Sequence, residues 1–162
     1  MTIKVSGASL ARVDRTSARY AYLREVHQKI AVKDSTTWGP EAAEEAAIRL
    51  NWVDLPESSK ELLPEISRVV DKFSTLSRIV LCGMGGSSLA PEVITSTAGV
   101  ALVVLDSTEP SQVQDALNGA ISRTAIIVSS KSGSTVETDS QKRIFEKAFT
   151  DAGIDKTDRI VI

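Results

Sequence analysis

The sequence predicts an α/β protein with a doubly wound parallel sheet, preceded by a helical N-terminal region. Four short apolar runs lie at residues 79–82, 100–105, 124–128 and 160–162. They are apolar at consecutive positions, as in strands that are covered on both faces of a parallel sheet. Segments of helical character at 88–98, 110–120 and 135–151 separate the runs. This alternation of strand and helix predicts parallel strands joined by helical crossovers.

Residues 1–77 have a different hydrophobic pattern, in which helical periodicity alternates with polar breaks, and they form the predicted helical region. Ala18–Val32 carries an apolar stripe that predicts an amphipathic helix. Pro40 is suited to the first turn of a second helix, which continues through an Ala/Glu-rich segment. A loop is predicted over Asn51–Pro56, and a third helix begins at Pro64.

The predicted domains are therefore a helical region, 1–77, and the N-terminal part of a sheet domain, 78–162. Ile162 falls inside the fourth predicted strand, which needs a following element to cover it. On this interpretation the chain is truncated within the sheet domain.

The composition is that of an ordinary globular protein and excludes several classes of function. Hydrophobic residues make up 42% of the 162 residues and charged residues 25%, so a packed core is expected. An aromatic content of 4% and a formal net charge of −2 argue against nucleic-acid binding, which uses stacking aromatic side chains and a basic surface. The single cysteine excludes an internal disulfide framework, and no apolar run reaches membrane-spanning length. We predict a cytoplasmic protein with no membrane or nucleic-acid partner.

The first candidate loop, Cys82–Ser88, follows the first predicted strand. Its glycines permit a close approach to a ligand, and the helix that follows presents free N–H groups to an anion. The candidate site residues here are Gly85, Gly86, Ser87 and Ser88. Asp106, at the end of the second strand, resembles the ribose-binding acid of a dinucleotide site. Ser88 occupies the third glycine position of that fingerprint, which disfavours a dinucleotide site. A second alternative is that the glycines serve only a tight turn.

The second candidate loop follows the third strand and is rich in hydroxyl groups. Its candidate phosphate-binding residues are Ser130, Lys131, Ser132, Ser134 and Thr135. Ser134 and Glu137 have the spacing of a capping box, so a helix is predicted to begin here. The P-loop pattern is absent, so a nucleotide triphosphate with magnesium is not implied. The alternative is a polar turn with a good cap. Both loops lie at the carboxyl ends of strands, where ligands bind in open α/β folds.

The two motifs resemble those of the glucose-6-phosphate isomerase family and its phosphosugar-isomerase (SIS) domain. Gly83–Glu92 is similar to the family's GxGGSxLxPE motif, with Ala90 in place of a glycine, and Ser130–Thr138 matches S-K-[ST]-x-[ST]-T-x-E-T in full. Leu105–Pro110 also resembles the family's second strand exit. The resemblance covers roughly residues 37–162.

This resemblance implies a site for the phosphate of glucose 6-phosphate or fructose 6-phosphate. Family contacts carry over to Ser130, the Lys131 backbone, Ser132 and Thr135, with Ser87 near the sugar phosphate. The implied enzyme is an aldose–ketose isomerase of glycolysis and gluconeogenesis, a homodimer at full length. No cofactor and no metal are implied.

The family's catalytic glutamate, histidine, lysine and arginine come from segments downstream of the part seen here. We therefore expect no catalytic residue in this chain, which would be a sugar-phosphate-binding portion without activity of its own. Glu137 is expected to cap the helix or line the site, and His27 lies at no family motif. Cys82, at a buried strand end, is interpreted as a core residue.

An alternative is a sugar-phosphate sensor, in which an SIS domain follows a helical DNA-binding head. The helical region permits this interpretation. However, residues 1–60 contain about as many acidic as basic residues and no basic recognition helix.

Overall fold

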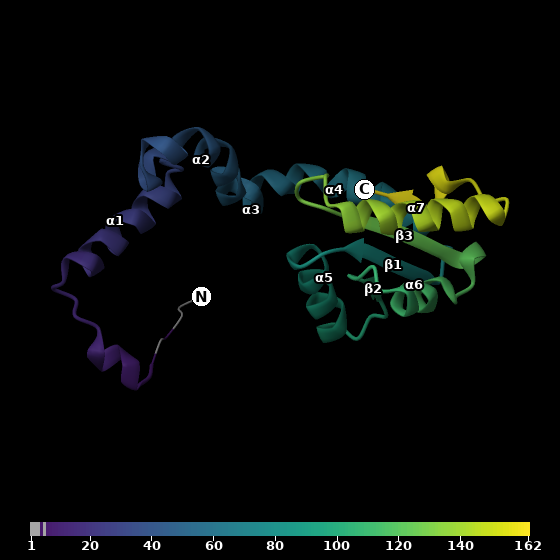
Figure 1. Cartoon of the computed structure of the whole chain (residues 1–162), viewed down its shortest axis with the longest axis horizontal. Helices are drawn as coiled ribbons and strands as arrows, with labels where there is room; N and C mark the ends of the chain where they lie inside the picture. Colours follow the sequence, from purple (N-terminus) through teal and green to yellow (C-terminus); the bar gives the residue numbers. More distant parts are fainter. Residues whose placement is uncertain (1–3, 5) are drawn as a thin grey trace. The chain divides into compact units, whose positions relative to one another are not determined.

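The structure is a computed structural model that describes residue 4 and residues 6–162. It contains two compact units, Met1–Leu63 and Pro64–Ile162 (Figure 1). Each unit is described by itself below. The domain boundary predicted after residue 77 stays a prediction. Across the described residues, no helix combines the length and the apolar character that crossing a membrane requires.

The first unit is built from short helices. The α-helices are α1 (Ala18–Ala31), α2 (Ala43–Arg49) and α3 (Leu55–Ser58), and single 3₁₀ turns at Ala8–Arg12, Ser35–Trp38, Pro40–Ala42, Leu50–Asp54 and Ser59–Leu62 flank or connect them. Ser17 caps α1, because its hydroxyl accepts a hydrogen bond from the Tyr20 N–H at 3.3 Å.

The prediction of a loop over Asn51–Pro56 is wrong. These residues form a 3₁₀ turn that passes directly into α3. Pro56 does not break the helix because it lies in the first turn of α3, where its missing N–H costs no hydrogen bond.

The second unit contains the predicted alternation of strands and helices. Its elements are α4 (Leu63–Phe73), β1 (Arg78–Gly83), α5 (Gly86–Thr97), β2 (Val103–Leu105), α6 (Pro110–Leu117), β3 (Thr124–Ser129), α7 (Val136–Asp151) and β4 (Ile160–Val161). All strand pairs are parallel, in the order β2-β1-β3-β4. The predicted α/β fold class, with a helical region before the sheet, is confirmed.

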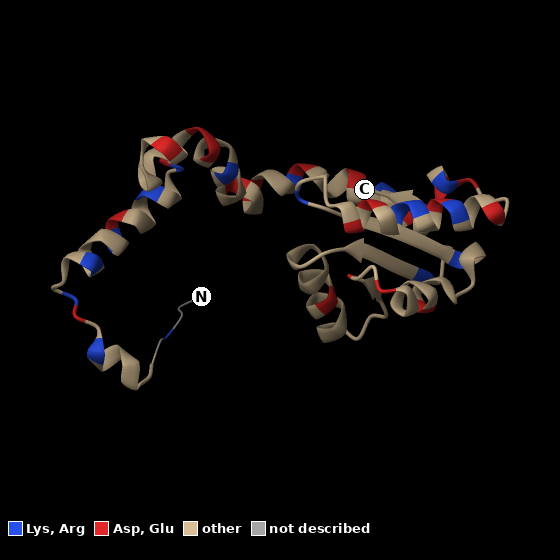
Figure 2. Ribbon diagram, viewed as in Figure 1, with Lys and Arg blue, Asp and Glu red and all other residues tan. Residues whose placement is uncertain are grey.

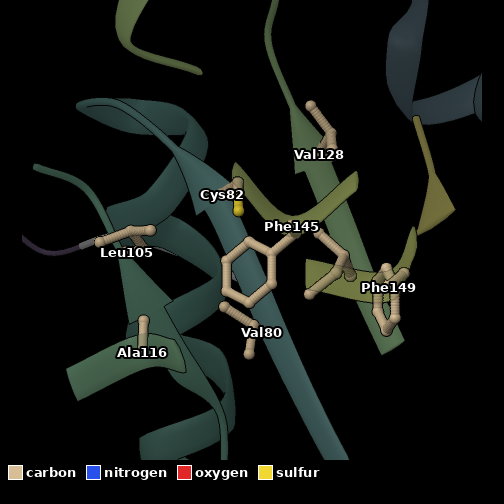
Figure 3. Close-up of a cluster of buried hydrophobic side chains, with 8 residues drawn as sticks. Val80, Cys82, Leu105, Ala116, Val128, Phe145 and Phe149 are labelled. Atoms are coloured by element: carbon tan, nitrogen blue, oxygen red, sulfur yellow. The ribbon is translucent and has the colours of Figure 1, made fainter. Parts of the chain in front are cut away.

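The core lies between the sheet and the helices α6 and α7. Phe145 and Phe149 of α7 are fully buried against Val80, Cys82 and other strand residues. Figure 3 shows the two rings among side chains of β1 and β3. Burial of each aromatic ring contributes about 1.5–3 kcal/mol. The core therefore anchors α7, and with it the loop that precedes this helix.

Charges on the outer surface of α7 are mostly paired along the helix. Figure 2 shows basic and acidic residues alternating there. Arg143 pairs with Asp139 at 2.7 Å and Lys147 with Asp151 at 2.8 Å. Exposed pairs of this kind contribute at most about 1 kcal/mol each. The position of α7 is therefore set by its buried rings.

The strand order places a switch point beside β1. β2 and β3 lie on opposite sides of β1, so the connections that leave β1 and β3 run in opposite directions along the sheet. Right-handed crossovers then put α5 and α7 on opposite faces. Ligands of open α/β sheets bind in the crevice that opens at such a point.

Gly83 and Ser129 hold the carboxyl ends of β1 and β3 close together. They are register partners, and a Cβ on Gly83 would lie 3.0 Å from the Ser129 carbonyl oxygen. Only glycine permits this approach without a shift of the backbone. The loops that follow β1 and β3 therefore start side by side.

Candidate functional site

The hydroxyl groups of the loop after β3 converge on one threonine. Thr135 Oγ1 lies 3.3 Å from Ser130 Oγ and 3.4 Å from Ser132 Oγ. Ser130 Oγ also accepts a hydrogen bond from the Gly133 N–H at 3.1 Å, and Ser134 Oγ donates to Ser132 Oγ at 3.3 Å. The loop thus folds back on itself and gathers its hydroxyls at the start of α7.

The first turn of α7 lacks a side-chain cap. Its N-cap residue is Thr135, whose side chain makes no capping hydrogen bond. The capping box predicted between Ser134 and Glu137 is therefore not formed, because the Ser134 hydroxyl bonds to Ser132 instead. Glu137 is exposed in the first turn. The uncapped first-turn N–H groups and the positive end of the helix dipole favour an anion at this position.

The loop after β1 is formed mainly by its backbone. Gly85 is the N-cap residue of α5 with a φ of 57°, a conformation that favours glycine. Ser88 is buried, and its hydroxyl donates to the Gly85 carbonyl at 2.9 Å. Its hydroxyl is therefore used within the loop. Gly86 has open space where a Cβ would lie, and Ser87 is half-buried.

The two loops share a pocket of about 480 Å³. It is lined by Met84, Gly86, Ser87, Lys131, Ser132 and Thr135. Of the predicted site residues, Gly86, Ser87, Lys131, Ser132 and Thr135 are brought together here. Gly85, Ser88, Ser130 and Ser134 lie in the same loops but do not line this pocket.

Two residues near the pocket were not identified from the sequence. Met84 lines it, and Gln141 of α7 is fully buried with its amide Nε2 3.7 Å from the Met84 sulfur. Gln141 belongs to the buried stripe of α7 with Thr138, Phe145 and Phe149. In the sequence, Gln141 could have been recognised as a polar residue on the otherwise buried face of a predicted helix.

The pocket lining contains a cation and hydroxyls but no carboxylate or imidazole. Burial raises the pKa of the Cys82 thiol to about 12, so this thiol stays neutral and is a core group. His27 is exposed on α1 in the first unit. In the part of the chain that the structure describes, no three His, Cys, Asp or Glu side chains form a metal site. The arrangement is suited to binding an anion.

Comparison with known proteins identifies relatives that are described as glucose-6-phosphate isomerases. No protein-family model matches the sequence. A probable glucose-6-phosphate isomerase of Haloarcula marismortui is 30% identical over 161 residues, which are 96% of this chain and 36% of that protein. A glucose-6-phosphate isomerase of Thermus thermophilus is 35% identical over 102 residues, 60% of this chain and 24% of that protein. The chain thus spans about a third or less of the length of these relatives.

Solved structures give the same picture of the fold. A hypothetical protein from Thermus thermophilus matches with a TM-score of 0.63 and 26% identity, over 88% of this chain and 34% of that one. A glucose-6-phosphate isomerase from Chlamydia trachomatis matches with a TM-score of 0.58 over 81% of this chain and 26% of that one. At 21% identity, this second match shows the fold alone.

The parallel sheet and its structural matches place the second unit among the doubly wound α/β proteins. Within that class, the sequence relatives are more specific, and they extend along almost the whole chain. The chain is similar to proteins described as glucose-6-phosphate isomerases, so the resemblance to that family seen in its two motifs is confirmed.

Proposed function

We propose that the pocket between the two loops binds the phosphate group of glucose 6-phosphate or fructose 6-phosphate. The observation that carries the proposal is the convergence of Ser130, Ser132 and Thr135 hydroxyls at the uncapped start of α7. A helix N-terminus and charge-assisted hydrogen bonds both favour phosphate. Lys131 adds a cation to the same pocket.

The residues have different roles in this proposal. Ser132, Thr135 and Lys131 contact the phosphate directly, together with backbone N–H groups of the loop and of α7. Ser130 and Ser134 hold the other hydroxyls in place through their hydrogen bonds within the loop. Gly86 and Ser87 face the same pocket from the first loop and contact the sugar, while Gly85 and Ser88 maintain the shape of that loop.

The proposed activity of the complete protein is aldose–ketose isomerisation. That reaction needs a base to carry a proton between C2 and C1 and a cation to stabilise the enediolate. The pocket lining contains no carboxylate or imidazole that could serve as the base. We therefore propose that this chain supplies binding and orientation, and that purified alone it shows only background turnover of fructose 6-phosphate in a coupled assay. Turnover that co-purifies with the chain and survives removal of host enzymes would contradict this.

Thr135→Val tests the binding site because it removes the central hydroxyl and keeps the shape of the side chain. A hydrogen bond to a charged group contributes about 1.5–3 kcal/mol, so the dissociation constant for phosphate or fructose 6-phosphate should rise by roughly ten- to a hundredfold. The matched control is Thr97→Val, which removes an exposed hydroxyl that donates to the Val93 carbonyl within α5. Equal affinity of Thr135→Val and the parent in calorimetric titration would show that the loop is only a turn. Titration with NADH tests the dinucleotide alternative, and no binding is expected.

A further inference from the structure

Gln141 touches the loops that follow two different strands, although it lies inside α7. Its amide Nε2 donates to the Ser107 carbonyl at 3.1 Å and lies 3.7 Å from the Met84 sulfur. Ser107 follows β2, and Met84 belongs to the loop after β1 and lines the pocket. Because α7 starts at the hydroxyl loop after β3, one side chain links all three loops at the carboxyl edge of the sheet.

Packing alone does not explain an amide at this position. Gln141 has an exposed fraction of 0% and lies on the same stripe as Phe145 and Phe149. Burying an amide costs free energy unless its hydrogen bonds are made, and an ordered Gln side chain also loses rotamer entropy. Among the described residues, the Gln141 Oε1 atom is buried without a hydrogen-bond partner, so this cost is only partly offset. A methionine or leucine would fill the space without that cost.

The contact to Ser107 extends into the loop after β2. Ser107 Oγ accepts a hydrogen bond from the Glu109 N–H at 3.0 Å, and Glu109 caps α6. A shift of the Gln141 amide would therefore move both the Met84 side of the pocket and the segment that leads into α6.

We propose that Gln141 is a positioning residue for the sugar-phosphate site: its amide fixes the loops after β1 and β2 relative to the hydroxyl loop that begins α7. This inference rests on the proposed phosphate site for its functional consequence, and on the hydrogen bonds alone for its structural one. Small displacements of a binding group by a supporting residue have large effects on affinity.

The test uses Gln141→Leu, which replaces the amide with an apolar side chain of similar volume and adds no methionine to the sequence. The sequence has two methionines, Met1 and Met84, so the methyl resonance of labelled Met84 reports directly on the pocket. In the variant we expect a displaced Met84 signal before any ligand is added. We also expect weakening of phosphate and fructose 6-phosphate binding by about three- to tenfold, the range of one net hydrogen bond. The control is Gln114→Leu, which removes an exposed amide that donates to Asn118 at the end of α6 and likewise adds no methionine.

Amide hydrogen exchange separates positioning from a general loss of stability. Faster exchange confined to residues 84–88 and 106–109, with the α7 core unchanged, supports the proposal. Uniform loss of protection, or an unchanged Met84 signal with unchanged affinity, overturns it. If the parent binds neither phosphate nor fructose 6-phosphate, the proposed function fails, and the Met84 shift and local exchange still decide the role of Gln141.

Discussion

The two loops of the pocket are built in opposite ways. The loop after β1 depends on its backbone: Gly83 permits contact with β3, Gly85 takes a positive φ, and the Ser88 hydroxyl is used to hold Gly85. The loop after β3 depends on its side chains, because its serines and Thr135 hold one another by hydroxyl contacts.

This difference separates stability from binding within a single pocket. A substitution in the backbone-built loop changes how closely β1 and β3 pack, so its main effect falls on folding. A substitution in the hydroxyl loop removes groups that contact the phosphate in the proposed function, so its main effect should fall on affinity.

Gly83→Val should have the largest effect on stability. The new side chain would begin 3.0 Å from the Ser129 carbonyl oxygen and 3.3 Å from the Ser87 carbonyl oxygen, both backbone atoms. Overpacking of this kind costs about 1–3 kcal/mol, and rigid neighbours place this site near the upper value. Urea unfolding should show the loss of stability, and titration should show that phosphate affinity falls as the loops separate.

Gly86→Ala is the matched control for Gly83→Val. Gly86 begins α5 and has no atom within 4 Å of an added Cβ. Stability should stay the same or rise by up to about 1 kcal/mol, because alanine restricts the unfolded chain. Equal losses in the two variants would refute the idea that contact with β3 distinguishes Gly83.

The thiol of Cys82 offers a local readout of the same contact. Burial raises its pKa to about 12, so labelling by a thiol reagent should be slow in the parent at neutral pH. Gly83→Val should label faster, because opening next to Gly83 exposes the thiol. Gly86→Ala should label at the parent rate.

Ser130→Ala should affect binding more than stability. Its hydroxyl accepts from the Gly133 N–H and contacts Thr135, so removing it loosens the hydroxyl loop. We expect about 1 kcal/mol of lost stability, the value of one net hydrogen bond, and roughly tenfold weaker phosphate binding. Calorimetry and urea unfolding on the same sample compare the two effects. A large loss of stability with unchanged affinity would show that this loop, like the loop after β1, acts mainly on folding, and would contradict the prediction.

The sequence predicted the sheet better than it predicted the loops that carry the site. Consecutive apolar runs are visible in a sequence, and β1 and β3 include the predicted runs 79–82 and 124–128. The strand predicted over 100–105 is shorter in the structure, Val103–Leu105. The start of α7 was misassigned by one residue, because a hydroxyl can bond to another loop hydroxyl as readily as to a backbone N–H. The link from Gln141 to Ser107 joins residues 34 apart, and no local pattern encodes such a contact.

Glu109→Gln should have the smallest effect, and it tests a third way of building a loop. In the described loop after β2, residues 106–109, neither a close glycine contact nor a hydroxyl-to-hydroxyl contact holds the chain. Instead, the Glu109 carboxylate accepts hydrogen bonds from the Ser111 hydroxyl and from the Ser111 and Gln112 N–H groups, the latter two at 2.9 and 3.1 Å.

The Ser111 hydroxyl and then the Gln112 N–H lower the pKa of Glu109. A lowered pKa in the folded state means that the carboxylate stabilises the fold above its unfolded pKa and loses this effect as pH falls through the folded value. The melting temperature of Glu109→Gln should therefore lie slightly below that of the parent at pH 7, and the gap should close as the pH falls through the lowered pKa of Glu109. Glu137→Gln is the control, because Glu137 is exposed in the first turn of α7, whose N-cap residue Thr135 makes no side-chain capping hydrogen bond. It should show a smaller gap and almost unchanged phosphate affinity. A gap for Glu109→Gln that widens on acidification would show that this carboxylate does not act as the cap of α6.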